Sequence, residues 1–252
     1  MNEAEDRFFE ARLSDMTDRC EKYGSPVYSS FLDERQCSLA EQWCRRNAGD
    51  SEYTFSGGYD GARRKMLAVY PAYCAGFAAD EFPMKCLTIT YRREDRLTHR
   101  DLLGSFMAQR LKREVIGDII VGEGESQVFV TEVAANDIMT SVSKIGRVGV
   151  RIADDRGFEL DASQKFKEMS GTVASLRLDC IVSLAADLSR EKAAALIRAD
   201  KVEVNHFPAA SVSQELSVGD IISVRGSGRY ILSGIDGLTR KGRIHIDLRK
   251  YI

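Results

Sequence analysis

Apolar residues in the first quarter of the chain recur at the spacing of amphipathic helices. Five of them, separated by alternating steps of four and three residues, form one stripe: Phe9, Leu13, Met16, Cys20 and Tyr23. The stripe predicts a helix that Asn2 caps at its start and Gly24 ends. A second helix is predicted for residues 33–46, where Leu39 and Trp43 lie four residues apart.

A glycine-rich segment follows the second predicted helix. Its glycines are Gly57, Gly58 and Gly61, and Arg63 and Arg64 come shortly after them. Such a run predicts a tight strand-to-helix turn, because glycine adopts backbone conformations that other residues avoid. Two interpretations stay open: an ordinary structural turn, or a backbone nest that binds phosphate with the arginines beside it. A Walker loop is excluded because the Gly-Lys-Ser/Thr ending is missing.

The middle of the chain alternates between strand-like and helix-like patterns. Strands are predicted at residues 87–91, 117–121, 127–131 and 148–152, and helices near 102–111 and 137–142. The order β-α-β-β-α-β is the plan that ferredoxin-like domains and RNA-recognition motifs share. Tyr91 and Phe129 are candidates to stack on bases, but the aromatic and glycine signature of those motifs is absent. Packing in a core is therefore the favoured role of both rings.

The last third of the chain predicts two short helices followed by strands. Residues 178–185 have apolar positions at helical spacing, and Ser189 is suited to cap a second helix. Arg190, Arg198 and Lys201 recur at intervals that place three cations along one side of that helix. Strands are predicted at residues 202–205, 218–224, 229–232 and 244–248.

Length and composition indicate a globular chain of several small domains. The 252 residues are 44% hydrophobic and 29% charged, which argues against long disorder and against one large core. No apolar run reaches the ~18 residues of a membrane span, and the acidic start predicts no secretory signal. The six cysteines contain no Cys-x-x-Cys pair, which favours reduced thiols in the cytoplasm.

The formal net charge of −2 hides an uneven distribution along the chain. Residues 1–83 hold 10 Lys and Arg against 15 Asp and Glu, residues 84–169 hold 14 of each, and residues 170–252 hold 12 against 9. The basic last third is therefore the first place to search for a polyanion site.

Catalytic patterns are incomplete in this sequence. The histidines His99, His206 and His245 are scattered and show no metal-ligand spacing, so no metal and no cofactor is predicted. His99-Arg-Asp101 resembles part of a kinase loop without its partners, and a helix start explains it better. Arg92, Arg93 and Arg100 lie near that start and are either additional RNA contacts or part of a solvated face.

The last third resembles the S-four RNA-binding domain, named after a small-subunit ribosomal protein. Four separated pieces match in order: Arg177-Leu-Asp, Leu188-Ser-Arg-Glu-Lys-Ala, Leu196 through Asn205, and Val218-Gly-Asp. Asp200 stands where that family most often has glycine, and Asp tolerates the positive φ expected there. The resemblance implies binding of structured RNA by residues of the two helices and the turn, namely Arg177, Ser189, Arg190, Lys192, Arg198, Lys201 and Asn205.

Segments outside that module resemble the YlmH family. The matching pieces are Phe55 through Lys65, Leu97-Thr-His-Arg-Asp-Leu-Leu-Gly-Ser, Leu111 through Ile119, and Lys144-Ile-Gly. The resemblance covers nearly the whole chain and implies three domains: an N-terminal domain, a middle domain like an RNA-recognition motif, and the S-four domain. It also implies binding to the large ribosomal subunit and a role in rescuing stalled nascent chains on peptidyl-tRNA.

The overall expectation is an α+β protein of three small domains. They are an N-terminal α/β domain at residues 1–83, a ferredoxin-like domain at 84–169 and an S-four domain at 170–252, with breaks near Pro83 and Ser170. The expected function is non-catalytic binding of rRNA or tRNA on the large subunit, with no membrane and no small-molecule substrate. Arg63 and Arg64 are included among the additional RNA contacts. The alternative is an RNA-modifying enzyme, suggested by Arg177-Leu-Asp179, which pseudouridine synthases also contain; pairing of Asp179 with an arginine is favoured.

Overall fold

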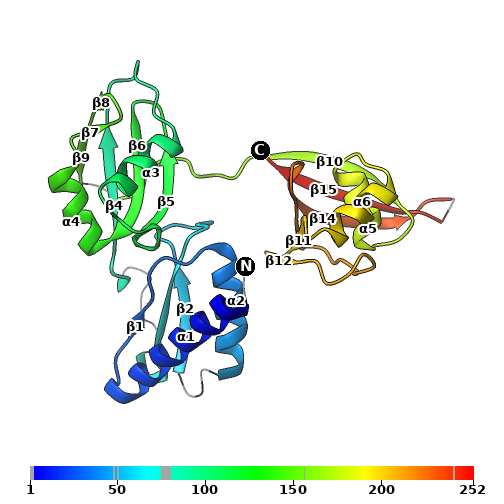
Figure 1. Cartoon of the computed structure of the whole chain (residues 1–252), viewed down its shortest axis with the longest axis horizontal. Helices are drawn as coiled ribbons and strands as arrows, with labels where there is room; N and C mark the ends of the chain where they lie inside the picture. The colour runs from blue at the N-terminus through cyan, green and yellow to red at the C-terminus, as the bar shows by residue number, and fades with distance from the viewer. Residues whose placement is uncertain (1–2, 48, 50, 75–80, 156, 241) are drawn as a thin grey trace. The chain divides into compact units, whose positions relative to one another are not determined.

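The computed structural model describes residues 3–47, 49, 51–74, 81–155, 157–240 and 242–252, and Figure 1 shows the course of the chain. The chain forms two compact units, residues 1–162 and residues 163–252. The sequence predicted three domains with breaks near Pro83 and Ser170. The structure differs, because residue 83 lies inside the first unit and the division falls between residues 162 and 163.

The N-terminal part of the first unit is a three-stranded antiparallel sheet with two helices. The strands are β1 (Val27–Tyr28), β2 (Ser51–Ser56) and β3 (Met66–Pro71) in the order β1-β3-β2, and η1 (Ala72–Cys74) follows. The helices are α1 (Glu3–Tyr23) and α2 (Glu34–Asn47), close to their predicted limits. Leu13 and Cys20 of α1 are buried in one cluster with Leu67 of β3, whereas Tyr23 at the end of the stripe is exposed. The expected cap Asn2 lies outside the described residues.

The glycine-rich segment joins two strands of this sheet. It connects β2 to β3, which pair antiparallel over their whole length from Ser51–Pro71 to Ser56–Met66. The predicted strand-to-helix turn is therefore wrong. The alternation of β3 was hidden because all but its last residue are buried, so Met66 to Tyr70 form a continuous apolar run.

The second part of the first unit has the predicted β-α-β-β-α-β order. Its elements are β4 (Met84–Thr90), α3 (His99–Ala108), η3 (Arg113–Val115), β5 (Ile116–Val121), β6 (Glu125–Thr131), α4 (Glu132–Ser141), β7 (Lys144–Ile145), β8 (Val148–Gly149) and β9 (Arg151–Ala153). The main sheet has the order β5-β6-β4-β9. Leu87 and Val128 face Phe106 of α3 and Ile138 of α4 in one buried cluster. The predicted last strand is split, because β8 pairs with β7 and only β9 joins the main sheet.

The two sheets of the first unit are joined by an aromatic cluster. Phe31, Tyr70 and Phe82 from the N-terminal part are buried with Phe129 of β6. The Phe31 amide also donates to the carbonyl of Glu114 over 2.8 Å. This shared core explains why residues 1–162 form one unit, since separate domains would each close around their own apolar residues.

The second unit contains a six-stranded antiparallel sheet and two helices (Figure 1). Its elements are β10 (Phe166–Val173), α5 (Leu178–Ala185), α6 (Arg190–Arg198), β11 (Val202–Val204), β12 (Phe207–Pro208), β13 (Ile221–Val224), β14 (Gly228–Leu238) and β15 (Ile244–Tyr251). The strand order is β10-β15-β14-β13-β11-β12. Ile181 of α5 and Ile197 of α6 are buried in one cluster with Leu232 and Ile246 of the sheet. The limits of α5 are those predicted.

Strand β10 was not predicted, and the expected domain boundary at residues 169–170 lies inside it. All eight residues of β10 pair with β15, from Phe166 opposite Tyr251 to Val173 opposite Ile244. The sequence of β10 is mostly polar and contains Gly171, so it lacks the apolar alternation of a strand. Its partner lies far along the chain, and such a pairing leaves no local signal.

Candidate nucleic-acid interface

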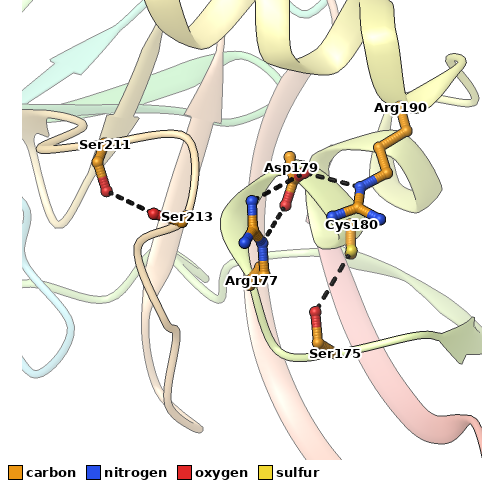
Figure 2. A network of polar contacts seen from close by, with 7 residues as sticks. All are labelled: Ser175, Arg177, Asp179, Cys180, Arg190, Ser211 and Ser213. Atoms are coloured by element: carbon orange, nitrogen blue, oxygen red, sulfur yellow. Dashed lines mark hydrogen bonds and ion pairs between the residues drawn. The ribbon is translucent and has the colours of Figure 1, made fainter.

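The buried carboxylate of Asp179 is the centre of the polar network at the start of α5 and α6 (Figure 2). Arg177 precedes α5 as its N-cap residue, and its Nε lies 3.1 Å from Asp179 Oδ1. Arg190, the first residue of α6, places its Nε 2.7 Å from Asp179 Oδ2. Asp179 is only 4% exposed, so one buried acid holds two arginines that are themselves partly in solvent.

The ionisation of Asp179 follows from these contacts. Burial by itself raises the pKa of Asp179, but hydrogen bonds from Arg190 and Arg177 outweigh burial and lower the pKa below its ordinary value. Asp179 is therefore a carboxylate at neutral pH, bound by two cations. The predicted pairing of Asp179 with an arginine is confirmed.

Ser189 caps helix α6, as predicted. Its side chain accepts a hydrogen bond from the Lys192 amide over 3.3 Å, which satisfies one of the open donors of the helix start. The hydroxyl is thus engaged within the protein. Ser189 supports the site by fixing where α6 begins.

The remaining cations of the second unit project from α6 and from the residues after it. Lys192, Arg198 and Lys201 are exposed, and no side-chain hydrogen bond or ion pair joins them to any residue that the structure describes. Asp200 has a φ of 53°, which confirms the positive φ expected there. Arg190 and Arg198 lie on one side of α6, at its two ends. Ala194 lies between them and is buried, so the two exposed cations do not form a continuous charged surface along the helix.

Asn205 has a structural role that the sequence did not reveal. It has a φ of 50°, its Nδ2 donates to Asp220 Oδ1 over 2.8 Å, and its Oδ1 accepts from the Ile221 amide over 2.9 Å. Both ends of the side-chain amide therefore bind protein groups. These bonds hold the turn after β11 against the start of β13.

The glycine-rich segment binds an anion, and that anion belongs to the protein. The carboxylate of Asp118 on β5 accepts hydrogen bonds from the Tyr59 hydroxyl at 2.8 Å, the Arg63 amide at 2.7 Å and the Arg64 amide at 3.2 Å. The segment thus has the backbone donors expected of a nest, with Asp118 where the second interpretation placed a phosphate. Burial and the nearby Asp118 carboxylate raise the pKa of Tyr59, which stays a hydroxyl.

Arg64 is not available to RNA, contrary to its inclusion among the additional contacts. Its Nε donates to the Ile116 carbonyl at 2.8 Å, and its Nη2 donates to the carbonyls of Phe31 and Arg113 at 3.0 and 3.1 Å. A guanidinium that satisfies three backbone carbonyls is a structural bridge between the two sheets. The side chain of Arg63 remains at the surface.

The β5-β6-β4-β9 sheet, called the middle sheet from here on, is covered on the face opposite to α3 and α4. Phe129 is only 3% exposed and packs against Tyr59 and Phe158, with ring centroids 5.4 and 5.3 Å away. Gln127, also on this face, accepts from the Leu160 amide over 3.0 Å and so holds residues 157–160 across the sheet. The hydroxyl of Tyr91 forms hydrogen bonds with two backbone carbonyls and with the Ser126 hydroxyl. Packing is thus confirmed as the role of both aromatics.

The candidate cations of residues 84–162 lie in the connection from β4 to α3 and in the first turn of α3. Arg92, Arg93 and Arg100 are all exposed, and Arg92 lies 3.5 Å from Asp95. Asp101 accepts from the Thr98 amide over 2.9 Å while Thr98 Oγ1 accepts from the Asp101 amide, which forms a capping box. Hydrogen bonds from Thr98 lower the pKa of Asp101. The helix-start interpretation of His99-Arg-Asp101 is confirmed.

One group of possible metal ligands occurs among the described residues, and sequence spacing did not reveal it. Asp236 of β14 lies near His245 and Asp247 of β15, with ligand atoms within 4.8 Å of one another. The strand pairing brings them together. His245 Nδ1 lies 3.3 Å from Asp236 Oδ2, so an imidazole–carboxylate contact accounts for part of this grouping.

No helix that the structure describes is long and apolar enough to cross a membrane.

Comparison with known proteins defines the class to which the chain belongs. Residues 78–157 match a family described as a putative RNA-binding domain in YlmH. The ribosome-associated protein quality control protein P2 of Bacillus subtilis (strain 168) is 30% identical over 224 residues, which cover 88% of this chain and 86% of that protein. The chain belongs to the YlmH family.

A solved structure supports the fold. The cell division protein ylmH from Streptococcus pneumoniae covers 60% of this chain and 92% of its own, with a TM-score of 0.52 and 23% sequence identity. At this identity the similarity is one of fold.

Proposed function

We propose that this chain binds structured RNA, either rRNA or tRNA, on the large ribosomal subunit and acts in quality control of stalled nascent chains. The name of the Bacillus subtilis relative supports the ribosomal assignment. The family description of residues 78–157 supports RNA as the ligand. The exposed cations of α6 and of the residues beside it supply the surface that would bind RNA. The proposed location is the cytoplasm, where ribosomes are found.

The observation that carries the proposal is the fixed position of two arginines on one buried carboxylate. Arg177 binds Asp179 through Nε and Nη2, and Arg190 binds it through Nε. The Nη1 group of Arg177 and both Nη groups of Arg190 have no partner among the described residues. An arginine fixed in advance loses less side-chain entropy when it binds phosphate, and its planar fork matches two phosphate oxygens. Lys192, Arg198 and Lys201 add exposed charges that release counterions on binding.

The mode of recognition that we propose is by shape. The middle sheet is covered by Tyr59 and Phe158, so the stacking used by RNA-recognition motifs has no open platform there. The RNA contacts that we propose for the first unit are therefore exposed cations of the β4–α3 connection and of the first turn of α3, namely Arg92, Arg93 and Arg100. Phosphate contacts of this kind position RNA without identifying its bases.

We also propose that the protein acts by occupancy, without turnover. The carboxylates of Asp101, Asp118 and Asp179 are each bound by protein donors. A cavity of about 540 Å³ beside the glycine-rich segment is the place to test for the alternative, an RNA-modifying enzyme. Burial raises the pKa of its Cys86 thiol to about 12, which disfavours a thiolate nucleophile.

The test is co-sedimentation of the full-length protein with purified large ribosomal subunits. The double variant Lys192→Glu, Arg198→Glu reverses two exposed charges that have no side-chain partner among the described residues. We expect it to lose at least tenfold in affinity. A loss from two phosphate contacts also lowers the magnitude of the salt slope by roughly 1.4–1.8.

The matched control is Arg12→Glu, Arg19→Glu, which makes the same charge change on two exposed positions of α1 in the acidic part of the chain. It should sediment like the parent. If the α6 variant also sediments like the parent, the proposed surface is wrong. Mass spectrometry of rRNA and tRNA after incubation should show no covalent change, and a new modification would refute the non-catalytic assignment.

A further inference from the structure

A second cavity lies on the same unit as the arginine pair. It has a volume of about 400 Å³ and is lined by the end of β10, by α5, by the α5–α6 turn, by the first residue of α6 and by Arg243, just before β15. The polar and charged side chains that matter here are Thr172, Asp187, Arg190 and Arg243. A volume of this size is at the small end of ligand pockets, which span roughly 300–1,000 Å³, and suits a phosphate group with its attached sugar.

Arg243 is fixed at the cavity by Thr172. Its Nε donates to Thr172 Oγ1 over 3.1 Å and its Nη2 donates to the Thr172 carbonyl over 2.6 Å. No contact within the described part of the chain uses its Nη1. Arg190, which lines the same cavity, is fixed through Nε by Asp179, and its two Nη groups also have no partner among the described residues. Two arginines thus line one cavity with their positions set and donors left over.

The charge balance at the cavity favours an anion. Arg190 and Arg243 contribute two cations, and Asp187 contributes one opposing carboxylate on the lining. The single negative charge of Asp179 does not neutralise Arg190 fully, because Arg177 binds the same carboxylate. Because both guanidinium groups line this one cavity, a phosphate bound there can accept charge-assisted hydrogen bonds from them.

We propose that this cavity binds a phosphate group of the RNA backbone between Arg190 and Arg243. The inference rests on the proposed function, since it names a contact of the same RNA. It adds Arg243 to the interface, a residue outside the segment that resembles the S-four domain. The pairing of β10 with β15 places Arg243, next to Ile244 of that ladder, beside Thr172 and the α5–α6 turn.

The experiment measures binding of the full-length protein to purified large-subunit rRNA over a series of salt concentrations. Arg243→Gln should weaken binding about tenfold and lower the magnitude of the salt slope by roughly 0.7–0.9. Thr172→Val keeps the charge but removes the side-chain acceptor that orients Arg243, so affinity should fall several-fold with an unchanged slope. Asp187→Asn should tighten binding, because it removes the opposing charge.

Lys167→Gln is the matched control for Arg243→Gln, since it also removes one exposed positive charge. Lys167 lies near the start of β10, at the opposite end of that strand from Thr172. It should change neither affinity nor slope, and circular dichroism should show all variants folded. If the parent binds rRNA and Arg243→Gln binds with the same affinity and slope, the cavity assignment is overturned while the proposed function stands. If the parent binds neither large-subunit rRNA nor tRNA in the same assay, the proposed function itself fails. Titration with inorganic phosphate distinguishes the source: binding only at millimolar concentration is expected, and micromolar binding would overturn the assignment to RNA.

Discussion

The carboxylate of Asp118 should be the main attachment between the glycine-rich segment and the middle sheet. The perturbation that tests this is Asp118→Ala, which removes the acceptor of the Tyr59 hydroxyl and of the Arg63 and Arg64 amides. Loss of those bonds should also loosen the Arg64 guanidinium, which spans the two sheets through three carbonyls. We therefore expect the whole first unit to become less stable.

The magnitude follows from the three bonds. A hydrogen bond to a charged group contributes about 1.5–3 kcal/mol, but Arg63 is exposed and water replaces part of what is lost. We take about 1 kcal/mol for each bond, so the free energy of unfolding should fall by about 3 kcal/mol. With a urea m-value of about 2 kcal/mol/M, the midpoint should fall by roughly 1.5 M.

The chain contains one tryptophan, and it reports on the right unit. Trp43 lies in α2 and is partly buried against the N-terminal core, so its fluorescence follows unfolding of the first unit. Hydrogen exchange at the Arg63 and Arg64 amides gives a local measure, and both should exchange faster in Asp118→Ala. Asp118→Asn keeps one acceptor oxygen and should fall between the parent and Asp118→Ala.

Asp60→Ala is the matched control, because Asp60 lies in the same segment and its carboxylate has no partner among the described residues. It should shift the urea midpoint by less than about 0.3 M, as ordinary surface substitutions do. If Asp118→Ala shifts the midpoint no further than Asp60→Ala and leaves both amides equally protected, Asp118 is not the main attachment of the segment. The segment would then be held by other contacts, and its backbone donors would be open to an external anion.

Four further substitutions test the packing, the helix cap and the buried acid. Gly58→Ala should destabilise the first unit by about 2–4 kcal/mol in the same urea assay, because its Cβ would overlap the ring of Phe129; Gly61→Ala has open space, and its positive φ of 84° alone should cost about 1 kcal/mol. Ser189→Ala should lower the stability of the second unit by about 1 kcal/mol through loss of the cap, with the salt slope of RNA binding unchanged; a lower slope would show that Ser189 contacts RNA instead. The pKa of Asp179 is lowered in the folded state, so its stabilising effect is present at neutral pH and is lost as pH falls below about 4. The stability difference between the parent and Asp179→Asn, measured by chemical denaturation from pH 7 to pH 2, should therefore shrink in that window, and a constant difference would contradict the assigned ion pairs.

Local patterns in the sequence determined the helices of this protein and much of the cationic surface. The stripe of α1, the limits of α5 and the cap Ser189 all depend on residues within three or four positions of one another. Helical hydrogen bonds and caps are formed over that same distance, so the sequence carries their signal directly. The exposed cations after Ser189 follow from the same helical spacing.

Tertiary structure alone decided which candidate side chains are bound or covered by other parts of the protein and which remain exposed. Arg64 differs from Arg63 because three carbonyls from distant segments meet its guanidinium, and Asp118 meets a loop more than fifty residues before it in the chain. Phe129 is closed to bases because Tyr59 and residues after the sheet cover it. Spacing along the chain cannot show these neighbours.

Strand pairing decided the rest. β10 forms a strand because β15 supplies its hydrogen-bond partners, although its own pattern is polar. That pairing moves the unit boundary to residue 162 and places Arg243 at the same cavity as Arg190. A ladder depends on backbone groups that every residue carries, so the side-chain pattern of one strand alone does not specify it.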